Sequence, residues 1–143
     1  MLYGPAGTGK SHICAACCDL WPEEIRYPRY WQEREFHEKV RESFGYTKGD
    51  YTQTIRDMVD HDLVIIDDIG STKNSEFKEE VLTAAIDYLF ENCTPAILTT
   101  NMSPDEIESL YHPRVYSRIF AKKNTVICLT DLPDRRLNGI EGE

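Results

Sequence analysis

A short segment near the start of the chain has the residue types and spacing of a phosphate-binding loop. It matches the pattern G-x-x-x-x-G-K-[ST]. Glycines let the backbone curl around an anion and direct its N–H groups inward, while the lysine reaches the β- and γ-phosphates and the hydroxyl ligates Mg²⁺. A glycine-rich turn without a ligand is the alternative. The residues concerned are Gly4, Pro5, Ala6, Gly7, Thr8, Gly9, Lys10 and Ser11, called the phosphate loop below.

Two acidic residues follow an apolar run in the middle of the chain. Residues 63–66 (LVII) lead directly into Asp67 and Asp68, as expected of a strand buried on both faces. A parallel strand would bring Asp67 to the carboxyl edge of the sheet, where a phosphate loop also lies. There Asp67 can hold Mg²⁺ through water, and Asp68 can polarise an attacking water. The alternatives are that Asp67 caps the strand end and that Asp68 only shapes the turn before Gly70.

A third polar group ends the apolar run that begins at residue 96. Asn101 follows two threonines there and could reach between a phosphate and the attacking water. A strand-end asparagine often only makes a turn. Because two other phosphate-site elements are present, the pattern favours the sensing role.

These polar residues need a scaffold that brings several strand ends together. Apolar β-type runs alternate with helical patterns, which predicts an α/β fold with a central parallel sheet of about five strands flanked by helices. Ser103, Pro104 and Glu106 predict a helix start with an N-cap serine and a capping box. The expected strands are 2–3, 25–30, 63–66, 96–99 and 126–129, of which the last three are expected to be buried. The expected helices are 10–20, 31–44, 51–59 and 76–92.

The composition limits the function classes. The chain has 143 residues with 41% apolar and 29% charged residues, an ordinary globular mix of one-domain size. A net charge of −9 disfavours non-specific nucleic-acid and membrane binding, although a local basic groove stays compatible with it. No apolar run approaches the roughly 18 residues that span a bilayer, and no signal-peptide pattern is present.

The cysteines indicate a reducing, cytoplasmic setting. Their number, 5, is odd, and no secretory signal precedes them, so a disulfide framework is not expected. Cys14 and Cys17 have zinc-like spacing, but no second ligand pair follows, and the pattern favours thiols packed in the core. The four histidines show no ligand spacing.

Taken together, the motifs resemble those of AAA+ ATPases, and most closely the DnaC/DnaI-type helicase-loader group with the related IstB-type transposition helpers. The resemblance rests on residues 4–12 (GPAGTGKSH), 63–70 (LVIIDDIG), 97–101 (ILTTN) and 113–120 (PRVYSRIF). Many NTPases share the first segment, but the series of four is far more specific and covers nearly the whole chain. It implies a P-loop NTPase with residues 1–143 as one AAA+ core domain and no C-terminal helical lid.

The resemblance also implies a role for each matching residue. These roles are Walker A for Lys10 and Ser11 with His12 in the nucleotide-binding segment, Walker B for Asp67 and Asp68, and sensor 1 for Asn101.

Two arginine pairs receive expectations from the same resemblance. Arg118 would be the arginine finger that acts on the nucleotide of a neighbouring protomer, with Arg114 one turn earlier as its support. Surface or salt-bridged arginines are the alternative. Arg135 or Arg136 would be the candidates to replace the sensor 2 arginine of the missing lid.

The implied function is Mg²⁺-dependent ATP hydrolysis in a helicase-loader-like replication accessory protein. The implied partners are a replicative helicase and further copies of the chain, which associate through the ATP site. The alternatives are a transposition helper of IstB type and a non-hydrolysing ATP-binding adaptor that modulates rings of a full-length relative. A small-molecule kinase would need a lid and an acceptor-binding segment that are not evident.

The start of the chain departs from the family pattern. Because only three residues precede Gly4, we expect a truncated first strand, without the adenine-contacting segment and the helicase-docking domain. A fragment, a late start and a reduced version are all compatible with this beginning.

Residues 26–31 (RYPRYW) interleave arginines with aromatic residues. Stacking combined with positive charge is how proteins hold single-stranded nucleic acid without sequence preference, so single-stranded DNA is a candidate ligand. A strand and helix start with ordinary exposed arginines is the alternative.

Overall fold

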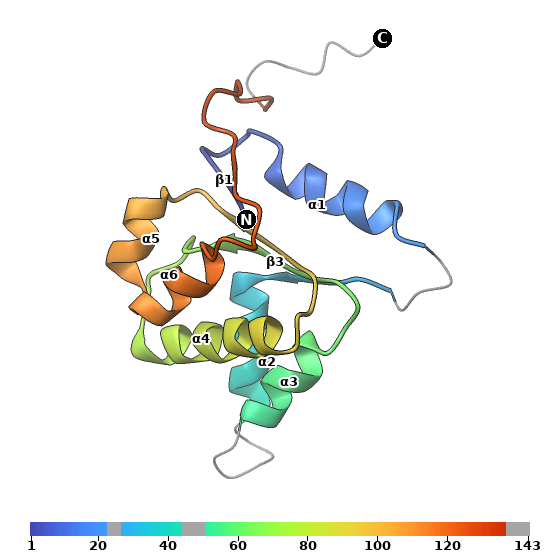
Figure 1. The fold of residues 1–143 in the computed structure, drawn as a ribbon, viewed down its shortest axis with the longest axis vertical. Helices are drawn as coiled ribbons and strands as arrows, with labels where there is room; N and C mark the ends of the chain where they lie inside the picture. Colours follow the sequence, from blue (N-terminus) through green and yellow to red (C-terminus); the bar gives the residue numbers. More distant parts are fainter. Residues whose placement is uncertain (23–26, 44–50, 137–143) are drawn as a thin grey trace.

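The computed structural model describes residues 1–22, 27–43 and 51–136, and a five-stranded sheet lies at its centre (Figure 1). The strands are β1 (Leu2–Tyr3), β2 (Arg29–Gln32), β3 (Val64–Ile69), β4 (Ala96–Thr100) and β5 (Ile127–Cys128). Their order in space is β2-β3-β4-β1-β5, and every neighbouring pair is parallel. The predicted α/β fold with a parallel sheet is confirmed.

The helices form two layers around this sheet. Helix α1 packs on one face, where its buried Cys14 lies with Leu2, Leu63 and Ile65. The larger apolar cluster on the other face is built mainly from α2, α3, α4 and α6. Figure 1 accordingly shows α1 set apart from the other helices. The helices are α1 (Lys10–Asp19), α2 (Glu33–Ser43), α3 (Thr52–Val59), α4 (Glu76–Glu91), α5 (Pro104–Leu110) and α6 (Pro113–Ile119).

Strand β3 shows why its sequence is continuously apolar. Successive side chains of a strand point to opposite faces, and here both faces carry helices. Ile65 therefore joins the α1 cluster, whereas Val64 and Ile66 join the larger one. The strand was predicted to end at residue 66 but continues through both aspartates to Ile69. Its pairing with β2 and β4 maintains the extended backbone beyond the apolar run.

Strand β2 lies later in the chain than predicted. It starts at Arg29, so Pro28, inside the predicted strand, precedes the observed one. Trp31, expected to open the following helix, lies in the strand and donates a hydrogen bond from Nε1 to the Met58 carbonyl oxygen at 3.1 Å. The parallel register with β3 fixes this extension. Residues 25–26 of the predicted strand and residue 44 of the predicted helix lie outside the described residues.

Strand β5 was predicted to be buried, but both of its residues are exposed, Ile127 by 45%. The strand lies at the sheet edge and pairs only with β1. Among residues 129–136, which the structure describes after β5, no helix is present. Because no helix follows β5 among the described residues and only β1 pairs with it, the apolar side chains of this edge strand are not covered on both faces.

The predicted start of α5 is confirmed. Ser103 Oγ accepts a hydrogen bond from the Glu106 N–H at 3.3 Å, and Glu106 Oε2 accepts one from the Ser103 N–H at 2.7 Å. The hydrogen bond from the Ser103 N–H, followed by the effect of the Ser103 side chain, lowers the pKa of Glu106 by stabilising the ionised carboxylate. The capping box turns the chain sharply after β4 and thereby fixes where that strand ends.

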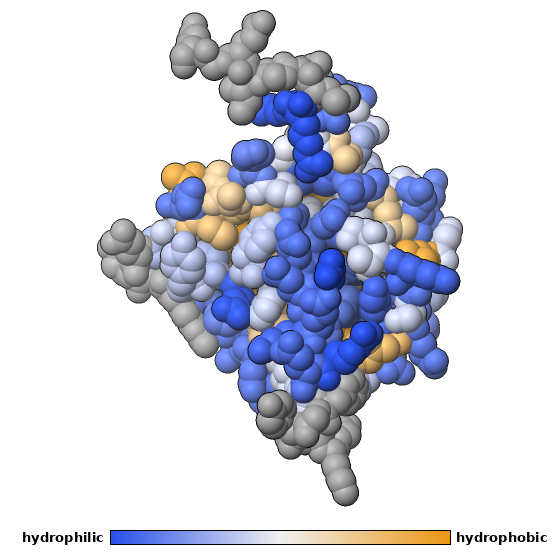
Figure 2. Space-filling model, turned by 180° about the vertical axis from the view of Figure 1, so that it is seen from behind, coloured by the Kyte–Doolittle hydropathy of each residue, from blue (hydrophilic) through white to orange (hydrophobic). Residues whose placement is uncertain are grey.

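The surface agrees with the acidic, polar composition. Figure 2 shows the rear face as mostly hydrophilic, with small separate hydrophobic areas. Among the helices that the structure describes, none has both the length and the apolar character needed to cross a bilayer. The exposed large hydrophobic residues are Ile13, Leu20, Tyr27, Val126, Ile127 and Leu132.

Candidate nucleotide-binding site

The phosphate loop connects β1 to α1 and has the backbone of an anion cradle. Gly4, Gly7 and Gly9 have φ angles of 148°, 81° and 96°, which residues with a Cβ rarely adopt. No heavy atom lies within 4 Å of the position that a Cβ on Gly9 would take. Helix α1 begins at the next residue, Lys10, so its free N–H groups open toward this space. The loop therefore fits a bound phosphate.

The Lys10 side chain is buried against the same loop. Its Nζ donates hydrogen bonds to the carbonyl oxygens of Gly4 and Pro5, both at 2.7 Å. Burial lowers the pKa of Lys10, and the negative charges of Asp68 and Asp67 oppose that shift. The ammonium group is thus held by the loop and is close enough to Asp67 and Asp68 to be affected by their charges.

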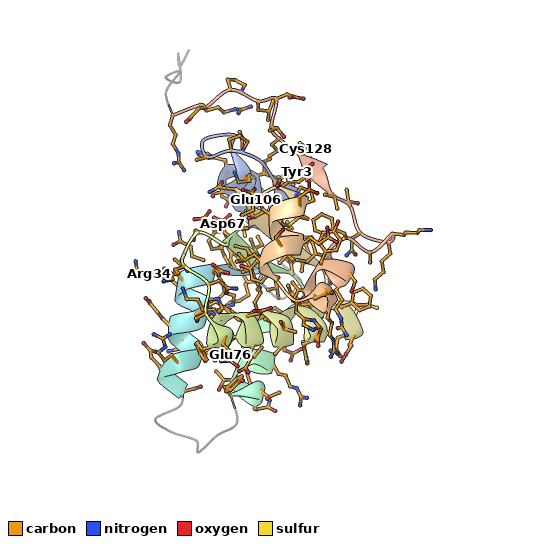
Figure 3. All side chains as sticks on the ribbon, turned by 90° about the vertical axis from the view of Figure 1, so that its left-hand side faces the viewer. Tyr3, Arg34, Asp67, Glu76, Glu106 and Cys128 are labelled. Carbon is orange, nitrogen blue, oxygen red and sulfur yellow. The ribbon has the colours of Figure 1, made fainter. Side chains whose placement is uncertain are left out.

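Three hydroxyl groups converge on the Asp67 carboxylate, which is only 3% exposed. Ser11 Oγ donates to Oδ2 at 2.8 Å, and the Tyr30 hydroxyl donates to the same oxygen at 2.5 Å. Thr99 Oγ1 donates to Oδ1. Figure 3 shows Asp67 at the end of the sheet near the phosphate loop. The predicted metal pair, Ser11 and Asp67, is therefore in direct contact, and its hard oxygen atoms suit Mg²⁺.

Asp68 and Asn101, two of the predicted catalytic residues, are also adjacent. Asn101 Nδ2 donates to Asp68 Oδ1 at 3.1 Å. Asp68 has a φ of 63°, a left-handed conformation, and its N–H donates to Thr99 Oγ1 at 2.8 Å. The β3–β4 register shifts between Ile66 and Ile69, so this irregularity redirects the second aspartate. Strained backbone of this kind costs about 1–3 kcal/mol and is concentrated at functional sites.

Sequence reasoning missed two residues that bind Asp67. Thr99 belongs to the quoted ILTTN segment, so its position at a strand end was an available signal. Tyr30 carried no such signal, because only the β2–β3 pairing brings it beside Asp67. Burial, together with the hydrogen bond to Asp67, raises the pKa of Tyr30.

Sequence reasoning also missed a buried carboxylate beside the turn after β3. Glu33, the first residue of α2, accepts hydrogen bonds from the Gly70 N–H at 3.1 Å and the Tyr111 hydroxyl at 3.4 Å. His37 Nε2 lies 3.6 Å from the same side chain. Burial and the negative charge of Glu33 raise the pKa of Tyr111. Glu33 therefore links the turn after β3 to the junction of α5 and α6.

The two predicted finger residues lie on α6 and face α4. Arg118 Nη1 is 2.8 Å from Asp87 Oδ1, and Arg118 Nη2 is 3.5 Å from Glu91 Oε1. Arg114 Nη2 lies 2.8 Å from the other oxygen of Asp87. Within one chain both arginines are therefore salt-bridged, which is one of the two interpretations of the sequence. Action on a neighbour's nucleotide would require an assembly of chains.

The segment after β5 closes over the phosphate loop. The Arg135 N–H donates to the Gly7 carbonyl oxygen at 3.0 Å, and the Asp134 carboxylate lies where a Cβ on Gly7 would stand. Arg136 adds to the effect of burial in lowering the pKa of Lys10. Both arginines proposed to replace sensor 2 are thus close to the loop, Arg135 through its backbone and Arg136 through its charge.

The remaining predicted residues differ in how deeply they are buried. Thr8 is buried, and its hydroxyl donates to the Pro5 carbonyl oxygen at 3.0 Å, whereas Ala6 and His12 are exposed. Cys14 is fully buried, as predicted for a core thiol.

In the segment considered for single-stranded DNA binding, most of the aromatic side chains make contacts inside the protein. Trp31 is in the core and Tyr30 binds Asp67, so only Tyr27, 72% exposed, remains as an open aromatic ring. The Arg29 guanidinium lies over the Trp31 ring at 4.1 Å. Tyr30 and Trp31 follow the other interpretation, since both lie in β2, and its pairing with β3 places their rings against opposite helix-covered faces of the sheet. Arg26 lies outside the described residues.

The chain matches one family over most of its length and has recognisable curated relatives. The family described as Bacterial DnaA ATPAse domain matches residues 1–125. The curated protein "Replicative helicase loader DnaC" of Escherichia coli (strain K12) is 24% identical over 119 residues, which are 83% of this chain and 49% of that protein. The chain thus spans about half the length of the curated relatives it matches.

Three solved structures share the fold. The crystal structure of the DnaC helicase loader has a TM-score of 0.75 at 21% identity and covers 89% of this chain and 75% of that one. The crystal structure of DnaI has a TM-score of 0.69 at 19% identity, with 94% and 72% covered. The replication initiator DnaA bound to AMPPCP and single-stranded DNA has a TM-score of 0.73 at 20% identity, with 89% and 38% covered.

These matches confirm the resemblance inferred from the four sequence segments. The sheet order, the phosphate loop and the paired aspartates agree with it as well. The chain therefore belongs to the bacterial DnaA ATPase domain family and is an AAA+ P-loop protein of the DnaC/DnaI type.

Proposed function

We propose that this chain binds ATP with Mg²⁺ at the phosphate loop, hydrolyses it, and serves in the cytoplasm as a helicase-loader-like accessory protein of DNA replication. The observation that carries the proposal is the meeting of Ser11 with Asp67 at 2.8 Å, beside the buried Lys10. The names of its relatives support the replication setting, and a DnaA structure with AMPPCP supports nucleotide binding.

Binding of the triphosphate rests on the loop backbone and Lys10. The glycine conformations turn N–H groups inward, and α1 adds the positive end of its dipole. Lys10 Nζ would exchange its two carbonyl partners for phosphate oxygens. Hydrogen bonds between ionised groups are roughly twice as strong as neutral ones, so this exchange favours the bound nucleotide.

Ser11 and Asp67 would hold the magnesium ion. When bound, Mg²⁺ supplies positive charge that neutralises the developing charge on the β- and γ-phosphate oxygens. The Ser11 hydroxyl would turn from Asp67 to the ion, and Asp67 would accept a hydrogen bond from the water between them. The groups that meet there are hydroxyl and carboxylate oxygen atoms, the type of ligand that a hard cation prefers.

Asp68 and Asn101 would orient the attacking water. The Asp68 carboxylate accepts the hydrogen bond from Asn101, so the two side chains are held in one arrangement at the sheet edge. An ionised carboxylate here can accept a proton from water as that water attacks the γ-phosphate. The Asn101 amide, held beside Asp68 by this hydrogen bond, would then sense the γ-phosphate.

Arg118 would complete the site of a neighbouring protomer. Its charge would stabilise the transition state in trans, with Arg114 beside it. Both arginines are paired with Asp87 in the single chain, so assembly would have to replace that partner. The proposal therefore includes self-association through the ATP site. Single-stranded DNA has weaker support: Tyr27 is exposed, and a DnaA relative is described with such DNA.

The proposal is tested by ATP turnover per protomer over a wide range of protein concentration, with Lys10→Ala as the blank. A rate per protomer that climbs with concentration supports a site shared between protomers. Tight ATP binding without turnover at any concentration would favour the non-hydrolysing adaptor. Capture of partners from the source organism then separates the remaining alternatives, since a helicase loader should recover a replicative helicase and an IstB-type helper a transposase.

A further inference from the structure

Tyr30 contacts the heart of the site but has no part in the mechanism above. It comes from β2, and its hydroxyl donates to Asp67 Oδ2 at 2.5 Å. Its ring is half-buried and packs on the cluster formed by α1 and the sheet, which includes Ile65. The ring is thus anchored in apolar surroundings while the hydroxyl projects to the carboxylate.

The hydrogen bonds of Asp67 leave little freedom to its carboxylate. Each carboxylate oxygen has two lone pairs. Those of Oδ2 are taken by Ser11 and Tyr30, and Oδ1 accepts from Thr99. Donors from β2 and β4 therefore hold the two oxygens from opposite sides of β3. If Ser11 turns to a cation, Oδ2 gains one open lone pair, and Tyr30 still fixes the other.

We propose that Tyr30 is a positioning residue for the Mg²⁺ site, whose hydroxyl holds Asp67 in the orientation that accepts the ion's water. The inference rests on the proposed function, because it concerns the same site. Tyr30 does not ligate the ion itself. It acts through Asp67, as outer partners of metal ligands do when they set ligand orientation.

A positioning role and simple ring packing predict different effects on nucleotide binding. A residue that orients Asp67 affects only nucleotide binding that depends on Mg²⁺. A residue that merely supports the local fold affects binding with and without the ion. In the proposed function Lys10 and the loop glycines would bind phosphate without using Asp67, so binding in the absence of Mg²⁺ provides the reference.

The test compares Tyr30→Phe with wild type and with the control Tyr27→Phe, which removes a hydroxyl from an exposed ring. Binding of a fluorescent ATP analogue is measured in excess EDTA and across a Mg²⁺ titration. Tyr30→Phe is expected to raise the half-saturating Mg²⁺ concentration about 10-fold, the lower end of the range for outer partners of metal ligands. Binding in EDTA should stay at the wild-type level, which also shows that the variant is folded.

Two results would overturn the inference. One is an unchanged Mg²⁺ titration for Tyr30→Phe, and the other is an equal loss of binding with and without Mg²⁺. Lys10→Ala separates these from failure of the proposed function. If Lys10→Ala binds the analogue as well as wild type, or wild type does not bind it at all, the proposed function fails and this inference fails with it.

Discussion

Arg118 on α6 and Asp87 on α4 form a close ion pair, with Nη1 2.8 Å from Oδ1. Asp87 also binds Arg114, so one carboxylate bridges two guanidinium groups, and Glu91 lies 3.9 Å from Arg114 and 3.5 Å from Arg118. Arg118 is only 15% exposed in this arrangement. To act in a neighbour's site, Arg118 must therefore break its ion pair with Asp87 of the same chain. This ion pair is the state from which an assembly would form.

Replacing Arg118 should remove catalysis without removing binding. Arg118→Ala is expected to lower ATP turnover by roughly 10³-fold, because the transition-state charge loses its partner from the next protomer. Affinity for ATP should stay within a few-fold of wild type. Turnover and analogue binding are measured on the same preparation.

The matched control is Arg34→Ala, which removes an exposed arginine of α2 that pairs with Glu38 (Figure 3). Its turnover should equal that of wild type. Unchanged turnover in Arg118→Ala, together with none in Lys10→Ala, would exclude the finger role.

Asp68 should show a trade of stability against activity. Its φ of 63° is unfavourable for a residue with a Cβ, so Asp68→Gly is expected to stabilise the fold by up to about 1 kcal/mol. Turnover should fall on the order of 10²-fold, because the group that accepts the proton is lost. Urea unfolding and steady-state turnover give the two values.

Cys93→Gly is the control for that experiment. Cys93 has a similar φ of 52° but lies in the turn between α4 and β4. It should show a comparable gain in stability with normal turnover. Loss of turnover in both variants, or in neither, would contradict the role assigned to Asp68.

Removal of the buried Glu33 carboxylate should be costly. Glu33→Ala leaves the Gly70 N–H and the Tyr111 hydroxyl without their acceptor. Each unsatisfied buried donor costs about 1–3 kcal/mol, so we expect a loss of at least about 2 kcal/mol in the free energy of unfolding. Glu38→Ala, on the exposed side of the same helix, should change it by less than about 0.5 kcal/mol. Equal unfolding midpoints for the two variants would refute this assignment.

The capping box of α5 should be sensitive to acid. The pKa of Glu106 is lowered below its ordinary value of 4.5 by hydrogen bonds with Ser103. The contribution to stability is therefore complete above pH 4.5 and is lost as the pH falls through the lower pKa of the folded state. An NMR titration should show this low pKa in wild type and a partial return toward the ordinary value in Ser103→Ala, which loses the hydroxyl but keeps the backbone N–H donor. Glu108→Gln, on the same helix, should leave the titration of Glu106 unchanged.

Predictions from local sequence succeeded where a short segment determines its own conformation. The glycines of the phosphate loop, the apolar run of β3 and the capping box at Ser103 follow from steric limits and hydrogen bonds between near neighbours in the chain. The order of the motifs along the chain was enough to predict a parallel sheet with Asp67 near the loop, because parallel strands bring their carboxyl ends to one edge.

Only the tertiary structure decided which side chains meet. Tyr30 was expected at the end of a strand and Trp31 at the start of a helix, yet the register of β2 against β3 places one on Asp67 and the other in the core. β5 was expected to be buried, yet its place at the sheet edge leaves it exposed. Sequence by itself determined the local conformations and the chemistry on offer. Contacts between distant segments, such as Arg118 with Asp87, depend on strand register and helix packing, which no local pattern encodes.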